Sequence, residues 1–431
     1  VDVFGTDEDP ELVRDALPFG LKTMESLLAT LPEHEGLLLT LCQGLFLTNN
    51  VVFIAINGLV GLALAPLGWM ATMPVMGYVV GSALSTGVVA RTQRHIGRQR
   101  SFQLGLVVAA LSAAVCAYAV TTKNFWLLVA ATVVAGFYNA NAALYRFAGP
   151  ELAAPSHKER AISLVLAGGI VGAFAGPNLA NGTRSLLAVP FAASYLSLVG
   201  VALLGLIAVS LIRFPTHVAP APGASSGRPL GEIVRQPVFV VAATAAALGY
   251  GVMNLLMAAT PIAMARCGLP FSDAALVLEW HVLGMFVPSF FTGHLIRRFG
   301  VLPIMTAGVV LNLACIAVAL TGVELTQFLV ALFLLGVGWN FLFVGGTTLV
   351  TEAYRPEEKN KAQGAMDFCV FTTMAFTSFA SGALVTTQGW TWLNAGSLLP
   401  VALTAAAIAW LAVARRRAAA MASAPRHPSA A

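Results

Sequence analysis

The sequence predicts an all-α membrane protein of twelve transmembrane helices, arranged as two six-helix halves with the same orientation. Hydrophobic residues make up 58% of the 431 positions and charged residues only 10%, whereas soluble domains carry about 25% charged residues. Apolar runs of about 20 residues, each long enough to cross a bilayer as a helix, follow one another along the chain. In addition, two charged stretches that lie 201 positions apart align without a gap.

The first half, 37–213, is expected to cross the membrane six times. Its predicted spans are 37–62, 67–89, 102–121, 124–147, 161–180 and 189–212. An N-terminal tail, 1–36, comes before them and holds nine acidic but only two basic residues. We expect this tail to be solvated, although its mixed spacing would also allow a surface helix.

The second half, 238–414, is expected to repeat this pattern. Its predicted spans are 238–263, 273–296, 302–322, 326–353, 365–386 and 392–414. The linker between the halves, 214–237, contains PTHVAPAPGASSGRP, a composition typical of a flexible tether. A C-terminal tail, 415–431, follows, and its residues 418–431 are expected to be disordered.

The distribution of basic residues predicts the orientation. The connections on one side of the predicted spans hold eighteen Lys and Arg residues and those on the other side hold three. Cytoplasmic loops are enriched in these residues, so both termini are expected in the cytoplasm of a bacterial inner membrane. No basic stretch is interleaved with aromatic residues, which argues against a nucleic-acid partner.

The repeat explains the two charged stretches, PELAAPSHKERA (150–161) and TEAYRPEEKNKA (351–362). A shift of 201 positions aligns both stretches and also the helices that precede them. The matched pairs include Glu151 with Glu352, Pro155 with Pro356, Lys158 with Lys359, Tyr138 with Trp339, and Asn139 with Asn340. Parallel repeats of this kind are a recognised transporter architecture, with the substrate site between the repeats near the bilayer midplane.

Two short basic turns carry a family resemblance. ARTQRHIGR (90–98) and GHLIRRFG (293–300) follow the second predicted span of each half. With the twelve spans and the central linker, they resemble the G-x-L-x-D-R-x-G-R signature of the major facilitator superfamily. This chain has Arg94 and Arg297 where the family has Asp. The resemblance implies a secondary transporter that works by alternating access, with its first, fourth, seventh and tenth helices lining a central cavity.

The departure from the signature suggests a conformational latch at the cytoplasmic side. If Arg94 replaces an acidic residue, its partner should be an acid on a neighbouring helix end, with Asp367 and Glu151 as candidates. The repeat adds Arg297 and Glu352 to this set. The alternative is that Asp367 is an ordinary residue near a helix N-terminus, where Asp is favoured.

Aromatic and carboxamide side chains on the cavity-lining helices predict a substrate site. Such groups suit a flat, polar and largely uncharged ligand, because rings stack while amides bind ring nitrogens and carbonyls. These side chains could instead bridge helices. The predicted substrate-binding residues are Asn49, Asn50, Tyr138, Asn139, Asn141, Tyr250, Asn254, Trp339 and Asn340.

The eighth span contains two ionisable residues, Glu279 and His281. Ionisable groups inside a membrane span are costly and usually functional, so either residue could couple transport to protons. They are two positions apart and therefore point to nearly opposite sides of the helix. Structural pairing with a neighbouring helix is the alternative for each.

The predicted function is therefore proton-coupled transport of a small organic solute by a monomer in the lipid bilayer. WNFLFVGGTTL (339–349) and WHVLGMFVPSFFTG (280–293) are similar to a bacterial subgroup that includes riboflavin transporters. GAFAGP (172–177) is similar to an element of proton-driven exporters, so a drug or metabolite exporter is the alternative. A transport-dead membrane sensor is an alternative of another class. No GxxxxGK[ST] loop, HExxH or CxxC is present, so we expect no ATP-driven transport, enzyme activity, cofactor or metal.

Overall fold

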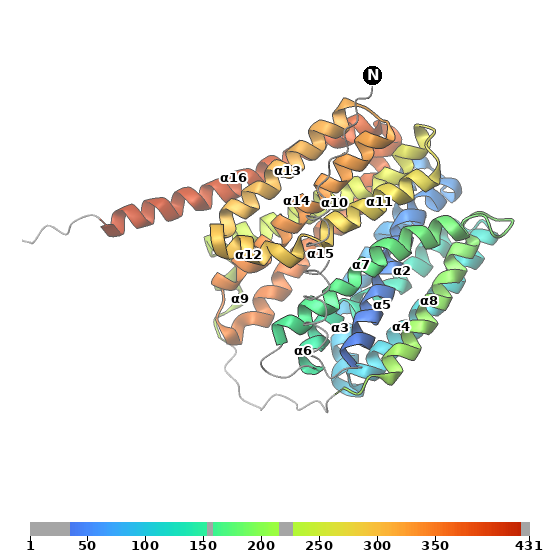
Figure 1. Ribbon diagram of the computed structural model, residues 1–431, viewed down its shortest axis with the longest axis horizontal. Coiled ribbons are helices and arrows are strands. Elements are labelled where there is room, and N and C mark those ends of the chain that lie inside the picture. Colours follow the sequence, from blue (N-terminus) through green and yellow to red (C-terminus); the bar gives the residue numbers. More distant parts are fainter. Residues whose placement is uncertain (1–34, 153–157, 215–226, 424–431) are drawn as a thin grey trace, which may run out of the picture.

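The structure is a computed structural model that describes residues 35–152, 158–214 and 227–423, and all regular secondary structure in these ranges is helical (Figure 1). The predicted acidic tail, 1–36, falls almost wholly outside the described residues. Ten of the described helices are long and apolar enough to cross a membrane, and an eleventh span results if α11 and α12, bent by 41°, are counted as one. The remaining expected span, 161–180, lies in the 26-residue helix α7, which would reach about 39 Å at 1.5 Å per residue.

The N-terminal half forms the blue-to-green part of Figure 1. Its predicted fourth span is divided into two helices, α5 and α6, at residues 143 and 144. The elements are α2 (Glu35–Leu64), η1 (Gly68–Met70), α3 (Met73–Ile96), α4 (Arg98–Thr121), α5 (Phe125–Ala142), α6 (Tyr145–Leu152), α7 (Lys158–Thr183) and α8 (Ala192–Leu211).

The C-terminal half forms the yellow-to-red part. Its second span is broken between α11 and α12, next to Pro288, because proline removes a backbone donor and clashes with the preceding helical turn. The elements are α9 (Leu230–Val234), α10 (Pro237–Arg266), α11 (Phe271–Phe286), α12 (Ser289–Phe299), α13 (Val301–Thr321), α14 (Leu325–Leu349), η3 (Val350–Glu352), η4 (Pro356–Glu358), α15 (Lys359–Thr387) and α16 (Gly389–Ser423).

Two glycines mark equivalent turns in the halves. Gly97 separates α3 from α4 with φ +81° and ψ 165°, and Gly300 separates α12 from α13 with φ +88° and ψ 161°. Only glycine adopts this backbone conformation without strain. The two basic turns that carry the family signature therefore share one geometry, although both have Arg at the position of the signature Asp.

The halves meet mainly along three helix pairs. α2 contacts α10, α3 contacts α15, and α7 contacts α11, while most other helix contacts stay within one half. The GAFAGP motif lies in α7, which contacts α11 of the other half and also α2 of its own half. A Cβ atom at Gly172 would overlap Leu47 of α2 and one at Gly176 would press on Val51, so the motif allows close packing of α7 on α2 inside the N-terminal half.

The linker is not a flexible tether throughout, because residues 227–236 are fixed to the second charged stretch. Arg228 donates from Nε and Nη2 to the two carboxylate oxygens of Glu358, at 2.8 and 2.7 Å. The backbone N–H groups of Arg228 and Arg355 also donate to this carboxylate, at 2.8 and 2.9 Å. Glu358 is fully buried. Four donors therefore hold one carboxylate, and we call this arrangement the linker clamp.

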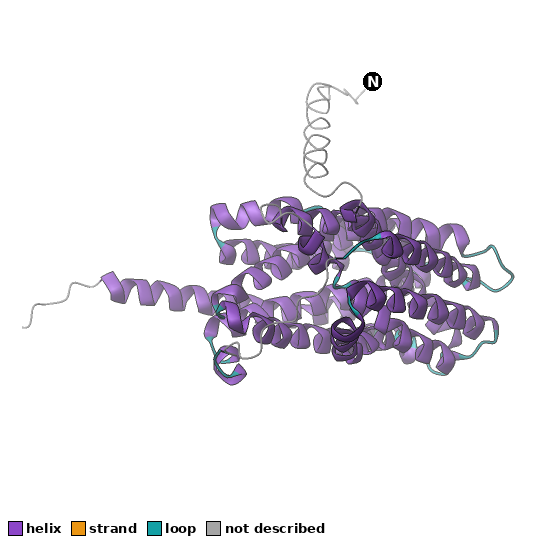
Figure 2. Cartoon of the chain, turned by 90° about the horizontal axis from the view of Figure 1, so that it is seen from below, coloured by secondary structure: helices purple, strands orange, loops and turns teal. Residues whose placement is uncertain are grey.

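The C-terminal tail also differs from the expectation. α16 continues to Ser423 and projects from the helix bundle (Figures 1 and 2). The sequence ARRRAAAMAS is rich in Ala and Arg, which have high helix propensity. Part of the tail expected to be disordered, 418–423, is therefore helical.

Candidate functional site

A cavity of about 300 Å³ lies between the two halves and forms the candidate site; we call it the central cavity. Side chains from α2, α3, α5, α10, α11, α12, α14 and α15 line it. Most of them are apolar or aromatic. Those that carry a polar group are Gln43, Asn50, Tyr78, Asn139, Tyr250, Asn254, Ser289, Trp339, Asn340 and Asp367. A mostly apolar cavity with a few placed polar groups is typical of small-molecule sites.

One wall of the central cavity is aromatic and comes from the C-terminal half. The rings of Trp339 and Phe343 are stacked, with centroids 5.1 Å apart and planes at 9°. Tyr250 meets both rings edge-on, at 5.2 and 5.4 Å. Trp339 is 6% exposed, and its Nε1 has no hydrogen-bond partner. This wall, made of Trp339, Phe343 and Tyr250, offers flat rings against which a planar ligand can stack.

The facing wall comes from the N-terminal half and is richer in amides. Gln43, Asn50 and Asn139 line the central cavity there, and Asn139 Nδ2 donates to Ser82 Oγ at 2.8 Å. Tyr78 stacks on Phe53 at 5.0 Å. Carboxamides both donate and accept hydrogen bonds, so this wall can pair with carbonyls, ring nitrogens or hydroxyls.

Two predicted site residues line the cavity but are committed to helix packing. Asn254 Nδ2 of α10 donates to the Met374 carbonyl and to the hydroxyls of Thr377 and Ser378, at 2.8 to 3.1 Å. Asn340 is fully buried. Its Oδ1 accepts from Thr292 at 2.7 Å and its Nδ2 donates to Met285 O and Ser289 Oγ at 2.7 and 2.6 Å. Both amides therefore join neighbouring helices of the C-terminal half.

Three predicted site residues lie away from the central cavity. Tyr138 is buried against Phe46, with ring centroids 5.8 Å apart. Asn141 accepts a hydrogen bond from Ser101 of α4 at 3.0 Å. Asn49 is buried beside the Tyr78 hydroxyl, but the pair does not reach hydrogen-bond geometry. These side chains pack within the N-terminal half, and on α5 the amide that lines the cavity is Asn139.

The predicted proton-coupling residues also lie outside the cavity lining. Glu279 accepts a hydrogen bond from Asn178 of α7 at 3.0 Å, across the contact between the halves. His281 is fully buried, with Nδ1 2.6 Å from the Leu332 carbonyl, so Nδ1 carries the proton that this contact needs. Its Nε2 has no partner. The two residues thus face different neighbours, as their spacing predicts.

The predicted latch residues whose side chains are described occupy different surroundings. Glu352 pairs with Arg415 of the same half, with Oε2 and Nη2 2.5 Å apart. Arg94 and Arg297 are exposed, and the side chain of Glu151 lies outside the described part of the chain. Asp367 lies in the central cavity. This position in the cavity could have been inferred from the sequence, because Asp367 is an ionisable residue inside a predicted span.

The sequence interpretation did not include Gln43, Tyr78, Phe286 or Phe343 among the site residues. All four line the central cavity. Gln43 lies two helical turns, or seven positions, before Asn50, and Phe343 lies one turn, or four positions, after Trp339. A search for neighbours at helical spacing would have found them, whereas Tyr78 lies on a helix without such a signal.

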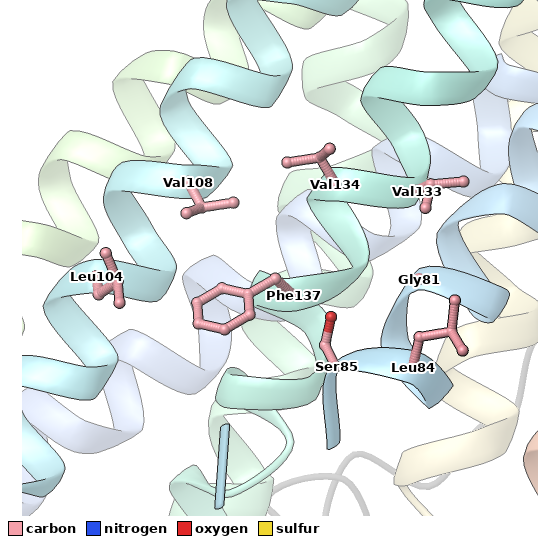
Figure 3. A pocket seen from close by; sticks show the side chains of 8 residues that line it. All are labelled: Gly81, Leu84, Ser85, Leu104, Val108, Val133, Val134 and Phe137. Atoms are coloured by element: carbon pink, nitrogen blue, oxygen red, sulfur yellow. The ribbon is translucent and has the colours of Figure 1, made fainter. Parts of the chain in front are cut away.

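A second hollow lies on the outer surface of the N-terminal half, between α3, α4 and α5 (Figure 3). It shares no residue with the central cavity. Apart from the hydroxyl of Ser85, its side chains are apolar, among them Leu84, Leu104 and Phe137. Leu84 is 71% exposed, as expected for a surface that faces lipid. Within the described residues, no group of three or more His, Cys, Asp or Glu side chains could hold a metal ion.

Comparison with known proteins gives these features a context. The model of the Major Facilitator Superfamily matches residues 36–279 and 242–430. A model of the TRAP transporter T-component matches only residues 6–55, a small part of the chain. The riboflavin transporter RfnT of Brucella anthropi is 40% identical over 369 residues, which cover 85% of this chain and 92% of that relative.

Solved transporter structures share the fold. A mutant of the nucleoside transporter NupG superposes with a TM-score of 0.70 at 12% identity and covers 88% of this chain and 99% of that one. A D-xylose-proton symporter superposes with a TM-score of 0.69 at 13% identity and covers 86% and 96%. At these identities the likeness concerns the fold alone.

Proposed function

The chain belongs to the major facilitator superfamily, and from that membership we propose that it carries riboflavin or a related uncharged flavin across the membrane by alternating access. The observation that carries the substrate proposal is the stacked pair of Trp339 and Phe343 in the central cavity. An isoalloxazine ring is flat and aromatic and has amide-like edges. It can stack on this wall while its edges bind the amides of the N-terminal half. The 40% identity to a riboflavin transporter supports the same substrate.

The distribution of contacts between the halves supports the transport mechanism. Gly97, Gly300 and the linker clamp lie at the end of the bundle that holds most of the basic connections, and we call it the basic end. Two hydrogen-bonded contacts join the halves toward the opposite end, Thr72 with Ser378 and Asn178 with Glu279. Rocking of one half on the other would break these contacts and open that end. We place the basic end in the cytoplasm of a bacterial inner membrane, together with both termini.

The proposal includes coupling to protons. Glu279 accepts from Asn178 across the contact that must open, so its protonation would alter the balance between the two arrangements of the halves. His281 is the second candidate, because its Nε2 is buried without a partner.

Flux of labelled riboflavin into liposomes that contain the purified protein tests this function. We expect saturable flux that rises with an imposed pH gradient and loses this dependence in Glu279→Gln. Glu324→Gln serves as a control, because Glu324 is exposed just before the start of α14. Proton-dependent flux in both Glu279→Gln and His281→Ala would remove the coupling proposal. Absence of any flux in a folded preparation would discard riboflavin as the substrate.

A further inference from the structure

Asp367 lines the central cavity. Neither the proposed proton coupling through Glu279 and His281 nor the stacking of a ring on the aromatic wall gives this side chain a role. Among the described lining residues it is the one Asp, Glu, Lys, Arg or His side chain. It is exposed, whereas the Asn254 and Asn340 amides of the same half are committed to helix packing. A carboxylate that a ligand can reach inside a membrane span is costly to maintain, which indicates a function.

The distance of Asp367 from the aromatic wall follows from the residue spacing along α15. Thr373 of α15 packs against Gly251, the residue after Tyr250. Asp367 precedes Thr373 by six residues, or about 9 Å along a helix axis. α15 begins at the basic end, so Asp367 lies on the basic-end side of the aromatic wall. Between them Val370 and Phe371 line the central cavity with apolar surface.

We propose that Asp367 recognises the hydroxyl chain of the ligand, an inference that rests on the proposed flavin transport. With the ring against Trp339, a polyhydroxyl chain attached to it extends along α15 toward Asp367. An ionised carboxylate only accepts hydrogen bonds, and hydroxyl groups are donors that match it. Asp367 already interacts within the protein, but its two oxygens have about four acceptor positions, so hydroxyl groups can be added.

The same side chain sets the selectivity for the charge of the ligand. A phosphate at the end of the chain would bring a second negative group toward the carboxylate, and like charges placed together are unfavourable. The described residues that line the central cavity include no Lys, Arg or His side chain that could pair with such a phosphate. The substrate class is therefore an uncharged ring with a free hydroxyl chain, and the phosphorylated flavin is excluded.

Equilibrium binding of three flavins to the purified protein tests this assignment. Riboflavin has the hydroxyl chain, lumiflavin has a methyl group in its place, and flavin mononucleotide adds a phosphate. We expect Asp367→Ala to weaken riboflavin binding about 10-fold, the scale of a lost hydrogen bond to a charged group, and to leave lumiflavin binding unchanged. Asp367→Asn should reduce the difference in binding affinity between riboflavin and flavin mononucleotide. Asp273→Asn, at the opposite end on α11, should change none of the three affinities.

The outcomes separate the two proposals. Unchanged lumiflavin binding in the Asp367 variants also shows that they are folded. Equal weakening of riboflavin and lumiflavin, or no weakening of either, would overturn the role of Asp367 and leave flavin transport standing. If the unmodified protein binds neither compound, flavin transport itself fails, and the role of Asp367 fails with it.

Discussion

The aromatic side chains of the central cavity are held in place by one another. Trp339 is fixed by the parallel ring of Phe343 and the edge of Tyr250, and Phe286 approaches it from α11 at 6.2 Å. Rings that are already ordered lose little freedom when a ligand stacks on them, which favours binding. Trp339 is therefore the residue whose removal should cost the most affinity for a planar ligand.

Truncation of Trp339 tests this expectation. Stacking of a planar base on an aromatic ring contributes about 1–3 kcal/mol, so Trp339→Ala should weaken riboflavin binding roughly 10-fold to 100-fold. Trp339→Phe keeps an aromatic surface and should lose less. Quenching of flavin fluorescence measures both affinities, and Trp392→Ala, a 69% exposed residue on α16, provides the control. Full affinity in Trp339→Ala would place the ligand elsewhere.

At the residue scale, the sequence predicted that aromatic and amide side chains line the site. It was less successful in predicting which of these side chains face the cavity. The cavity is lined by Trp339, Tyr250, Asn50 and Asn139, among others. It is not lined by the predicted residues Asn49, Tyr138 and Asn141. The cause is that both sides of α5 are apolar, so no polar face distinguishes the cavity side from the helix-packing side. Spacing places Tyr138 and Asn139 on different faces but does not say which face is inside.

At the scale of elements, the linker clamp fixes the end of the linker to the C-terminal half more firmly than the composition of the linker suggests. The stretch 351–362 is the second copy of the internal repeat, and it binds Arg228 through Glu358. The first copy has His157 at the position equivalent to Glu358. The repeat predicted that both stretches are structural turns, but a contact between distant segments has no local sequence signal.

The clamp makes stability depend on pH in a defined direction. The Arg228 side chain and the surrounding N–H donors hold the pKa of Glu358 well below its ordinary value, which is about 4.3 for an unperturbed Glu. A depressed pKa contributes stability above the unfolded-state value, and this contribution is lost as the pH falls through the folded-state value.

We therefore expect Glu358→Gln to lower the unfolding temperature by a few degrees, and by the same amount from pH 8 to about pH 5. The difference from the unmodified protein should shrink only below about pH 4. Thermal unfolding in detergent across this range measures it. Glu357→Gln, at the exposed neighbouring position, should have little effect. A difference that disappears already between pH 7 and pH 5 would contradict the clamp.

At the scale of the whole molecule, the twelve-helix repeat could be predicted but the contact between its halves could not. Periodic apolar runs and the shift of 201 positions are properties of the sequence alone. The surfaces that meet are as apolar as those that face lipid, so hydropathy does not mark them. Only the structure shows that Trp69 packs on Phe379, with ring centroids 5.7 Å apart, and that Thr72 donates to Ser378 O at 2.6 Å.

These contacts can be used to stop the proposed motion. Trp69→Cys combined with Phe379→Cys places two thiols across the contact between the halves, in a background where the exposed Cys267 and Cys369 are replaced by Ser. A short reversible thiol cross-linker should then hold the end opposite the basic end closed. It should abolish transport, and reduction should restore it. Trp69→Cys alone should be insensitive to the cross-linker.

Riboflavin counterflow is the most direct test of the central claim, that one cavity between two moving halves carries a flavin. Liposomes that contain the protein are loaded with unlabelled riboflavin and then exposed to labelled riboflavin, without any ion gradient. We expect a transient accumulation of label that needs internal riboflavin and that disappears when Trp69→Cys and Phe379→Cys are cross-linked. Failure of a folded protein to exchange riboflavin, or exchange that persists in the cross-linked protein, would contradict this claim.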